Sequence, residues 1–204
     1  MKLYTPGPVP VPQRVMHVAC QPIIHHHSEQ FHQVLATTRS NIGRIIQTEQ
    51  TVVLLSGSAM TAIESVTAAS LRPSDRVMVL RHGRFGDRLA DCCAVYGADV
   101  VSCAVPWGNS IAPEQFRSTL QNELTKGPLR AVWLVHSETS TGVSIDLEQI
   151  SSILRELSPE TLLLVDGVTS VAIQELCIDS WGVDAVVCGV QKGLMCPPGI
   201  GIIA

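Results

Sequence analysis

Short apolar runs alternate with amphipathic stretches along the whole chain. The apolar runs are rich in Val, Ile and Leu and have the length of buried strands; they cover residues 51–55, 76–80, 99–105, 131–136, 161–166, 184–188 and 200–204. Between them, helical patterns cover residues 29–46, 58–71 and 87–96, a stretch that opens at Pro113 and a stretch that Asp146 can cap. This alternation predicts an α/β fold in which helices cover both faces of a mostly parallel sheet.

Small, hydroxylated or charged residues follow five of the predicted strands in this otherwise apolar sequence. Ligands of open α/β sheets bind beyond the carboxyl ends of the strands, so we expect these segments to meet at one edge of the sheet. The segments are "SGSAMTA" (56–62), "RHGRFGDR" (81–88), "HSETSTG" (136–142), "DGVTS" (166–170) and "GVQKG" (189–193).

The segment "SGSAMTA" leads from a predicted strand into a predicted helix. The free N–H groups at the start of a helix bind anions, and Gly57 allows a ligand close to the backbone, so this turn can hold a phosphate. Taken alone, an ordinary helix-capping turn explains the same residues. The turn lacks the glycine patterns of a nucleotide P-loop and of a dinucleotide site.

Two ionisable residues follow later strands. Asp166 ends an apolar run, where a carboxylate is costly to bury unless it is paired. Three kinds of partner would account for it: the N–H groups of a helix that it caps, the cation of a salt bridge, or a cationic nitrogen of a bound ligand. Lys192 is one of only three lysines and lies between Val190 and Leu194. A lysine after a strand usually reaches solvent, but a desolvated lysine has a lowered amine pKa and forms Schiff bases.

Together, these features match what pyridoxal 5′-phosphate requires of a protein. A helix start would hold the phosphate, Asp166 would hold the ring nitrogen in its protonated form, and Lys192 would hold the aldehyde. Phe85, in "GRFGDR", offers a flat apolar face for the ring, although core packing alone also explains it.

Composition supports one globular domain in a reducing compartment. The chain has 204 residues, 46% of them hydrophobic and 16% charged, and a net charge of −4 without a basic run, so we expect no nucleic-acid partner. Its seven cysteines form no C-x-x-C pair, which favours free thiols. No signal peptide or membrane-spanning run is visible, and we predict a cytoplasmic protein without a membrane partner.

Several motifs occur in the order seen in one known family. With the five segments above, "TPGPVPVP" (5–12) and "HHHSEQF" (25–31) make the sequence resemble class V aminotransferases of the pyridoxal-phosphate fold type I group, in the alanine–glyoxylate and serine–pyruvate branch. The resemblance implies a three-layer αβα large domain over residues 1–204, with an N-terminal arm at 1–27. We interpret His25–His27 as part of the family motif and expect no metal site.

The resemblance also implies a role for each matching residue. Lys192 is similar to the Schiff-base lysine and Asp166 to the partner of the ring nitrogen. The other cofactor-binding positions are Ser58, Ala59, Met60 and Gln191 at the phosphate, Phe85 and Val168 at the ring faces, and Thr139 at the ring oxygen. Gly7 corresponds to a position near the substrate. Cysteine desulfurases of this fold carry histidine where this chain has Gln191, which favours transamination.

The implied reaction transfers the amino group of a small amino acid, of the alanine or serine type, to a small 2-oxo acid such as glyoxylate or pyruvate. The family implies a homodimer in the full-length form. Because the sequence ends within a strand-like run, we expect a fragment that lacks the C-terminal small domain and is inactive alone. Two alternatives stay open: another class V reaction, such as that of a lyase or desulfurase, and a non-catalytic fragment.

Overall fold

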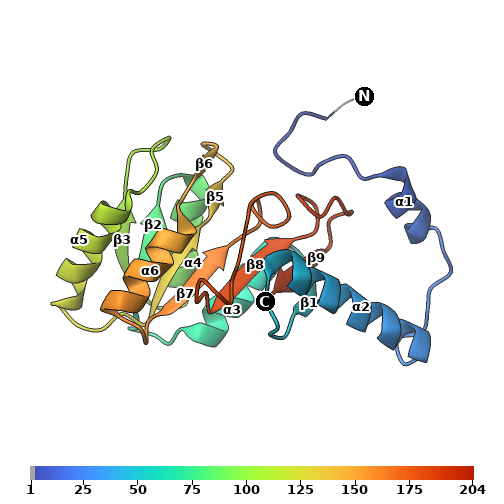
Figure 1. Ribbon diagram of the computed structural model, residues 1–204, viewed down its shortest axis with the longest axis horizontal. Helices are drawn as coiled ribbons and strands as arrows, with labels where there is room; N and C mark the ends of the chain where they lie inside the picture. Colours follow the sequence, from blue (N-terminus) through green and yellow to red (C-terminus); the bar gives the residue numbers. More distant parts are fainter. Residues whose placement is uncertain (1–2) are drawn as a thin grey trace.

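A seven-stranded sheet runs through the centre of the protein (Figure 1). The computed structural model describes residues 3–204, and its strand order is β1–β9–β8–β7–β4–β2–β3. Strands β3, β2, β4, β7 and β8 are parallel, whereas β9 is antiparallel to both of its neighbours. The bounds are β1 (Val53–Ser56), β2 (Arg76–Arg81), β3 (Asp99–Ala104), β4 (Ala131–Val135), β7 (Leu162–Asp166), β8 (Ala185–Gly189) and β9 (Ile200–Ile203).

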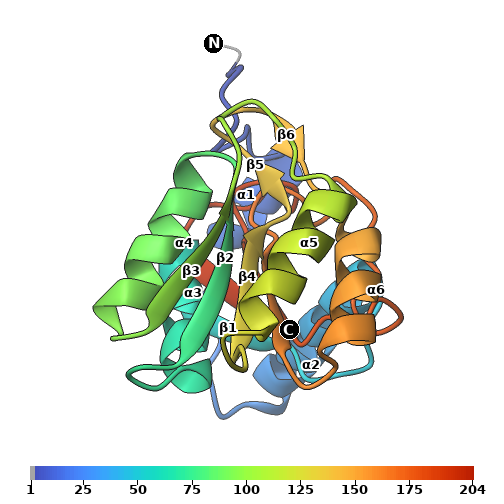
Figure 2. The same cartoon turned by 90° about the vertical axis from the view of Figure 1, so that its left-hand side faces the viewer.

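Helices cover both faces of this sheet, as Figure 2 shows. Helices α3 (Ala59–Ser70) and α4 (Arg84–Val95) pack on one face, and α2 (Glu29–Ile46), α5 (Pro113–Leu124) and α6 (Leu147–Leu157) pack on the other. Along β2 the side chains alternate between the two cores, because successive residues of a strand point to opposite faces. Val77 and Val79 belong to the α3–α4 core, and Met78 and Leu80 to the opposite core.

The predicted fold class is confirmed, and each of the seven predicted strands is present within one or two residues of its expected ends. Helix α4 differs from the prediction, since it begins at Arg84 and not at Asp87. Three elements were not predicted. One is the short helix α1 (Gln13–Ala19), which buries none of its residues, and the other two are the strands β5 (Ser137–Glu138) and β6 (Val143–Ser144), which pair as a hairpin.

Other predictions concern the termini and the cysteines. Met1 and Lys2 of the predicted N-terminal arm lie outside the described residues. All seven cysteines are free thiols, as the sequence predicted, and five of them are buried. Within residues 3–204, no helix is both long and apolar enough to cross a bilayer. The same residues contain no group of three or more histidine, cysteine, aspartate or glutamate side chains placed to hold a metal ion.

Candidate active site

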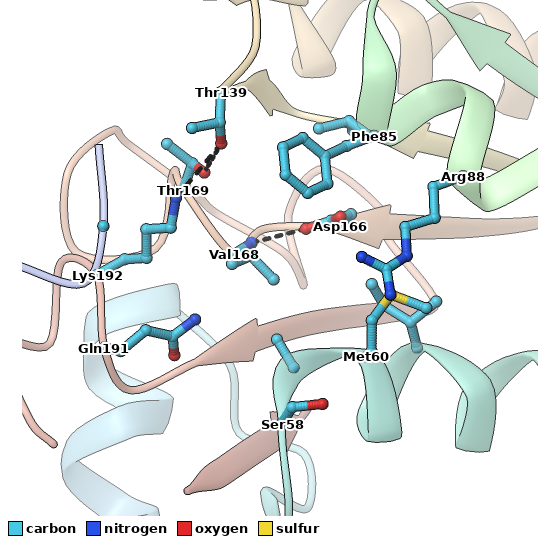
Figure 3. A pocket seen from close by; sticks show the side chains of 14 residues that line it. Ser58, Met60, Phe85, Arg88, Thr139, Asp166, Val168, Thr169, Gln191 and Lys192 are labelled. Carbon is cyan, nitrogen blue, oxygen red and sulfur yellow. Dashed lines mark hydrogen bonds between the residues drawn. The ribbon is translucent and has the colours of Figure 1, made fainter. Parts of the chain in front are cut away.

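A cavity of about 290 Å³ lies at the carboxyl ends of the parallel strands, and the five polar segments meet there. All ten residues singled out in the sequence contribute to its wall. Figure 3 shows the arrangement of the labelled side chains around this space. The lining residues are Gly7, Ser58, Ala59, Met60, Ile63, Phe85, Arg88, Val135, Thr139, Asp166, Val168, Thr169, Gln191 and Lys192.

Asp166 is the last residue of β7 and is 4% exposed. One oxygen, Oδ1, accepts a hydrogen bond of 2.9 Å from the Val168 N–H, and no ion pair with Asp166 occurs within residues 3–204. Burial raises the pKa of this carboxyl to about 6; the Val168 N–H and the charge of Lys192 oppose the rise, whereas Glu138 adds to it. The site therefore holds a carboxylate that a bound cation would stabilise.

Lys192 lies in the loop after β8, with its amine directed toward two hydroxyl groups (Figure 3). Nζ is 3.5 Å from Oγ1 of Thr139, which is 2.5 Å from Oγ1 of Thr169. Burial lowers the pKa of the Lys192 amine, and the negative charge of Asp166 opposes that effect. A lowered pKa increases the fraction of neutral amine, the form that attacks a carbonyl carbon.

The start of α3 forms another wall of the cavity. The Ser58 hydroxyl accepts from the Thr61 N–H at 3.3 Å, and the Thr61 hydroxyl accepts from the Ser58 N–H at 3.2 Å, which makes a reciprocal capping box. The N–H groups of Ala59 and Met60 stand at the first two helical positions, which have no acceptor within a helix. These two groups are therefore available to an anion in the cavity.

Sequence reasoning missed four of the lining residues: Ile63, Val135, Thr169 and Arg88. Thr169 belongs to "DGVTS", where a second hydroxyl near Asp166 was a usable signal.

Arg88 follows Phe85 by three residues, so the two share one face of α4. The predicted helix start at Asp87 hid this relationship. Within residues 3–204, the Arg88 side chain forms no ion pair or hydrogen bond, and it lies beside Met60 at the cavity wall (Figure 3).

Comparison with known proteins gives the same family across nearly the whole chain. A family profile described as Aminotransferase class-V matches residues 14–204. The chain is 38% identical over 202 residues to a protein of Synechococcus sp. (strain PCC 6716) named soluble hydrogenase, small subunit. That alignment covers 99% of this chain and 52% of that protein. It is 34% identical over 203 residues to the L-aspartate–glyoxylate aminotransferase of Paracoccus denitrificans, covering 98% of this chain and 51% of that enzyme.

A solved structure shows the same likeness in three dimensions. The crystal structure of an alanine–glyoxylate aminotransferase from Nostoc sp. superimposes with a TM-score of 0.91 at 34% identity. The alignment covers 98% of this chain and 52% of that one. The chain thus spans about half the length of the relatives it matches.

Proposed function

The chain belongs to the class V family of pyridoxal-phosphate-dependent aminotransferases, and from this premise we propose that its cavity binds pyridoxal 5′-phosphate. The observation that carries the proposal is that Lys192, Asp166 and the start of α3 line one cavity. The chain spans about half the length of its relatives, so we propose the reaction for the whole protein. There the site would transfer an amino group from a small amino acid to a small 2-oxo acid.

The residues present fit the cofactor. Asp166 is a buried carboxylate with a raised pKa and a single hydrogen bond from Val168, so a protonated ring nitrogen would supply the cation that it lacks. The N–H groups of Ala59 and Met60, with Ser58 and Gln191, would hold the phosphate. Phe85 and Val168 would enclose the ring, and Thr139 would donate to the ring oxygen.

When bound, the cofactor supplies an aldehyde that condenses with amines and a ring that withdraws electrons from the substrate Cα. Lys192 would hold that aldehyde until a substrate amine replaces it. The neutral amine of Lys192 would then take a proton at Nζ and return it, because burial keeps its pKa below the usual lysine value. Thr139, 3.5 Å from Nζ, orients the amine. Gly7 lies against the lysine side chain, where the substrate would enter.

We propose alanine or serine as the type of donor and glyoxylate or pyruvate as the type of acceptor. The names of two similar proteins, an L-aspartate–glyoxylate and an alanine–glyoxylate aminotransferase, support glyoxylate. Gln191 supports transamination over the desulfurase reaction.

The cytoplasmic location and the homodimer stay predictions. The exposed side chains of Met16 and Val18 on α1 agree with a surface for a partner subunit.

A titration tests the cofactor assignment. Adding pyridoxal 5′-phosphate to the chain should produce a visible absorption band that borohydride abolishes, and pyridoxal without phosphate should give a weaker one. The absence of the band at millimolar cofactor would contradict the assignment.

A turnover assay tests the reaction. The whole protein should convert alanine or serine only when glyoxylate or pyruvate is present. Release of sulfide from cysteine, or of ammonia without an acceptor, would favour the desulfurase or lyase alternative.

A further inference from the structure

Glu138 is a fully buried carboxylate with no charged partner. It belongs to β5, pairs with Val143 in β6, and is 0% exposed. Within residues 3–204 it forms no ion pair with a lysine, arginine or histidine. A carboxylate is costly to remove from water unless hydrogen bonds compensate for the lost hydration. The hydrogen-bond donors that surround Glu138 therefore indicate what the residue does.

Four donors from two separate segments converge on Glu138. Oε2 accepts from the N–H groups of Phe85 and Gly86, at 3.0 Å and 3.1 Å. Oε1 accepts from the N–H and the hydroxyl of Ser140, at 3.0 Å and 2.7 Å. The Ser140 hydroxyl in turn accepts from the Arg84 N–H at 3.0 Å. Glu138 and Ser140 together bind the first three N–H groups of α4.

Helix α4 is thus capped by a distant strand and not by its own sequence. Its N-cap residue, Gly83, has no side chain to accept a hydrogen bond. A β-carbon at Gly83 would lie 2.3 Å from Cγ and 2.5 Å from Cδ of Glu138, so glycine is what admits the carboxylate. The positive end of the helix dipole also stabilises a negative charge at this point.

The residues on both sides of this contact line the cavity. Phe85 contributes one of the captured N–H groups, and Thr139 follows Glu138 directly. Glu138 itself does not line the cavity. We propose that Glu138 is a positioning residue that fixes the Phe85 ring relative to Thr139 and Lys192. The inference rests on the proposed function only in that the bound group is taken to be pyridoxal 5′-phosphate.

The first experiment needs no cofactor. Glu138→Gln keeps the size of the side chain but turns an NH₂ group toward N–H donors, so one pair of hydrogen bonds is lost. Amide hydrogen exchange should accelerate about tenfold on the side that the NH₂ group faces, either at Phe85 and Gly86 or at Ser140. The control is Glu148→Gln, at an exposed position in the first turn of α6, which should leave these three amides unchanged. Unchanged exchange in Glu138→Gln would overturn the proposal.

The second experiment separates positioning from general damage. Glu138→Gln should raise the Kd for pyridoxal 5′-phosphate about tenfold and leave the Kd for inorganic phosphate unchanged, because α3 binds the phosphate. In a Phe85→Ala background, the same substitution should change the cofactor Kd less than twofold, since Glu138 would act through the ring. Equal losses for both ligands, or a full tenfold loss without the ring, would overturn the proposal.

A milder variant covers the case in which Glu138→Gln does not fold. Ser140→Ala removes one donor to Glu138 and the acceptor of the Arg84 N–H. It should accelerate exchange at Arg84, whose N–H loses its acceptor, and to a smaller extent at Phe85, because Glu138 loses one of the donors that hold it. The loss of cofactor affinity should be smaller, with the same dependence on Phe85. Unchanged exchange at both amides would overturn the proposal. If the wild-type chain fails to bind pyridoxal 5′-phosphate, the proposed function fails, while the exchange data still decide whether Glu138 holds the two segments together.

Discussion

Gly7 packs directly against the side chain of Lys192. A β-carbon built on Gly7 would lie 2.7 Å from both Cδ and Cε of the lysine and 3.2 Å from Nζ. The φ of Gly7 is +155°, a backbone conformation that other residues rarely adopt. The Val9 N–H also donates to the carbonyl of Gln191 at 3.1 Å. The N-terminal segment therefore helps to place the amine of a lysine near the other end of the chain.

Gly7→Ala should displace the lysine amine. The added methyl group cannot fit at 2.7 Å from two carbon atoms, so either Lys192 or the N-terminal segment must move. We expect reductive trapping of pyridoxal 5′-phosphate on Lys192 to slow about tenfold, measured by peptide mass mapping after borohydride. Gly108→Ala is the control, because Gly108 also has a positive φ, +93°, but a β-carbon built on it would have no other atom within 4 Å. Equal trapping in both variants would contradict the role of Gly7.

Lys192→Ala should abolish the trapped adduct. Lys126 does not line the cavity, and its amine lies 2.6 Å from Glu123 on an exposed turn, so it cannot replace Lys192. Lys126→Ala should therefore label as well as the wild type does. The measurement is again the position of the pyridoxyl group by mass spectrometry. An adduct on Lys126 or Lys2 that persists in Lys192→Ala, with none on Lys192 in the wild type, would remove Lys192 from the site.

Arg88→Gln should weaken binding of the cofactor phosphate. Its guanidinium has no partner within residues 3–204 and lies beside Met60 at the start of α3. Because the side chain is exposed, we expect only about a fivefold rise in the Kd for pyridoxal 5′-phosphate, reduced further by salt, and no change for pyridoxal. Arg84→Gln, on the same helix but outside the cavity lining, is the matched control. An equal effect on both ligands would contradict an electrostatic role.

The sequence predicted the sheet and most of the cavity because both depend on local patterns. Apolar runs define the strands, and the parallel order brings their carboxyl ends together, so Asp166 and Lys192 could be placed at one edge of the sheet. Contacts between distant segments leave no local pattern. The cap that Glu138 provides for α4 explains why the helix starts at Arg84, before any capping side chain of its own. The same displaced start concealed Arg88.

Asp166 destabilises the chain when no cation is bound. Its pKa is about 6 in the folded chain against an ordinary value of 3.8, so between these values the folded state binds a proton more readily than the unfolded state does. The contribution of Asp166 to the free energy of unfolding therefore falls as the pH rises from about 4 to about 6, and that contribution is constant above this range. The difference in pKa corresponds to about 3 kcal/mol at most.

Asp166→Asn should consequently stabilise the free chain and weaken the site. The asparagine oxygen can still accept from the Val168 N–H, but no charge is buried. In urea unfolding at pH 7.5 we expect a gain of about 2 kcal/mol, which shrinks as the pH falls through 6 and disappears near pH 4. With pyridoxal 5′-phosphate the sign should reverse, because an amide cannot hold a protonated ring nitrogen as a carboxylate does. Asp91→Asn, an exposed position on α4, should show neither effect. Two results would contradict this account of Asp166 as a buried carboxylate that lacks a cation. One is an Asp166→Asn variant that is no more stable than the wild type at pH 7.5, and the other is a variant that the cofactor stabilises as much as it stabilises the wild type.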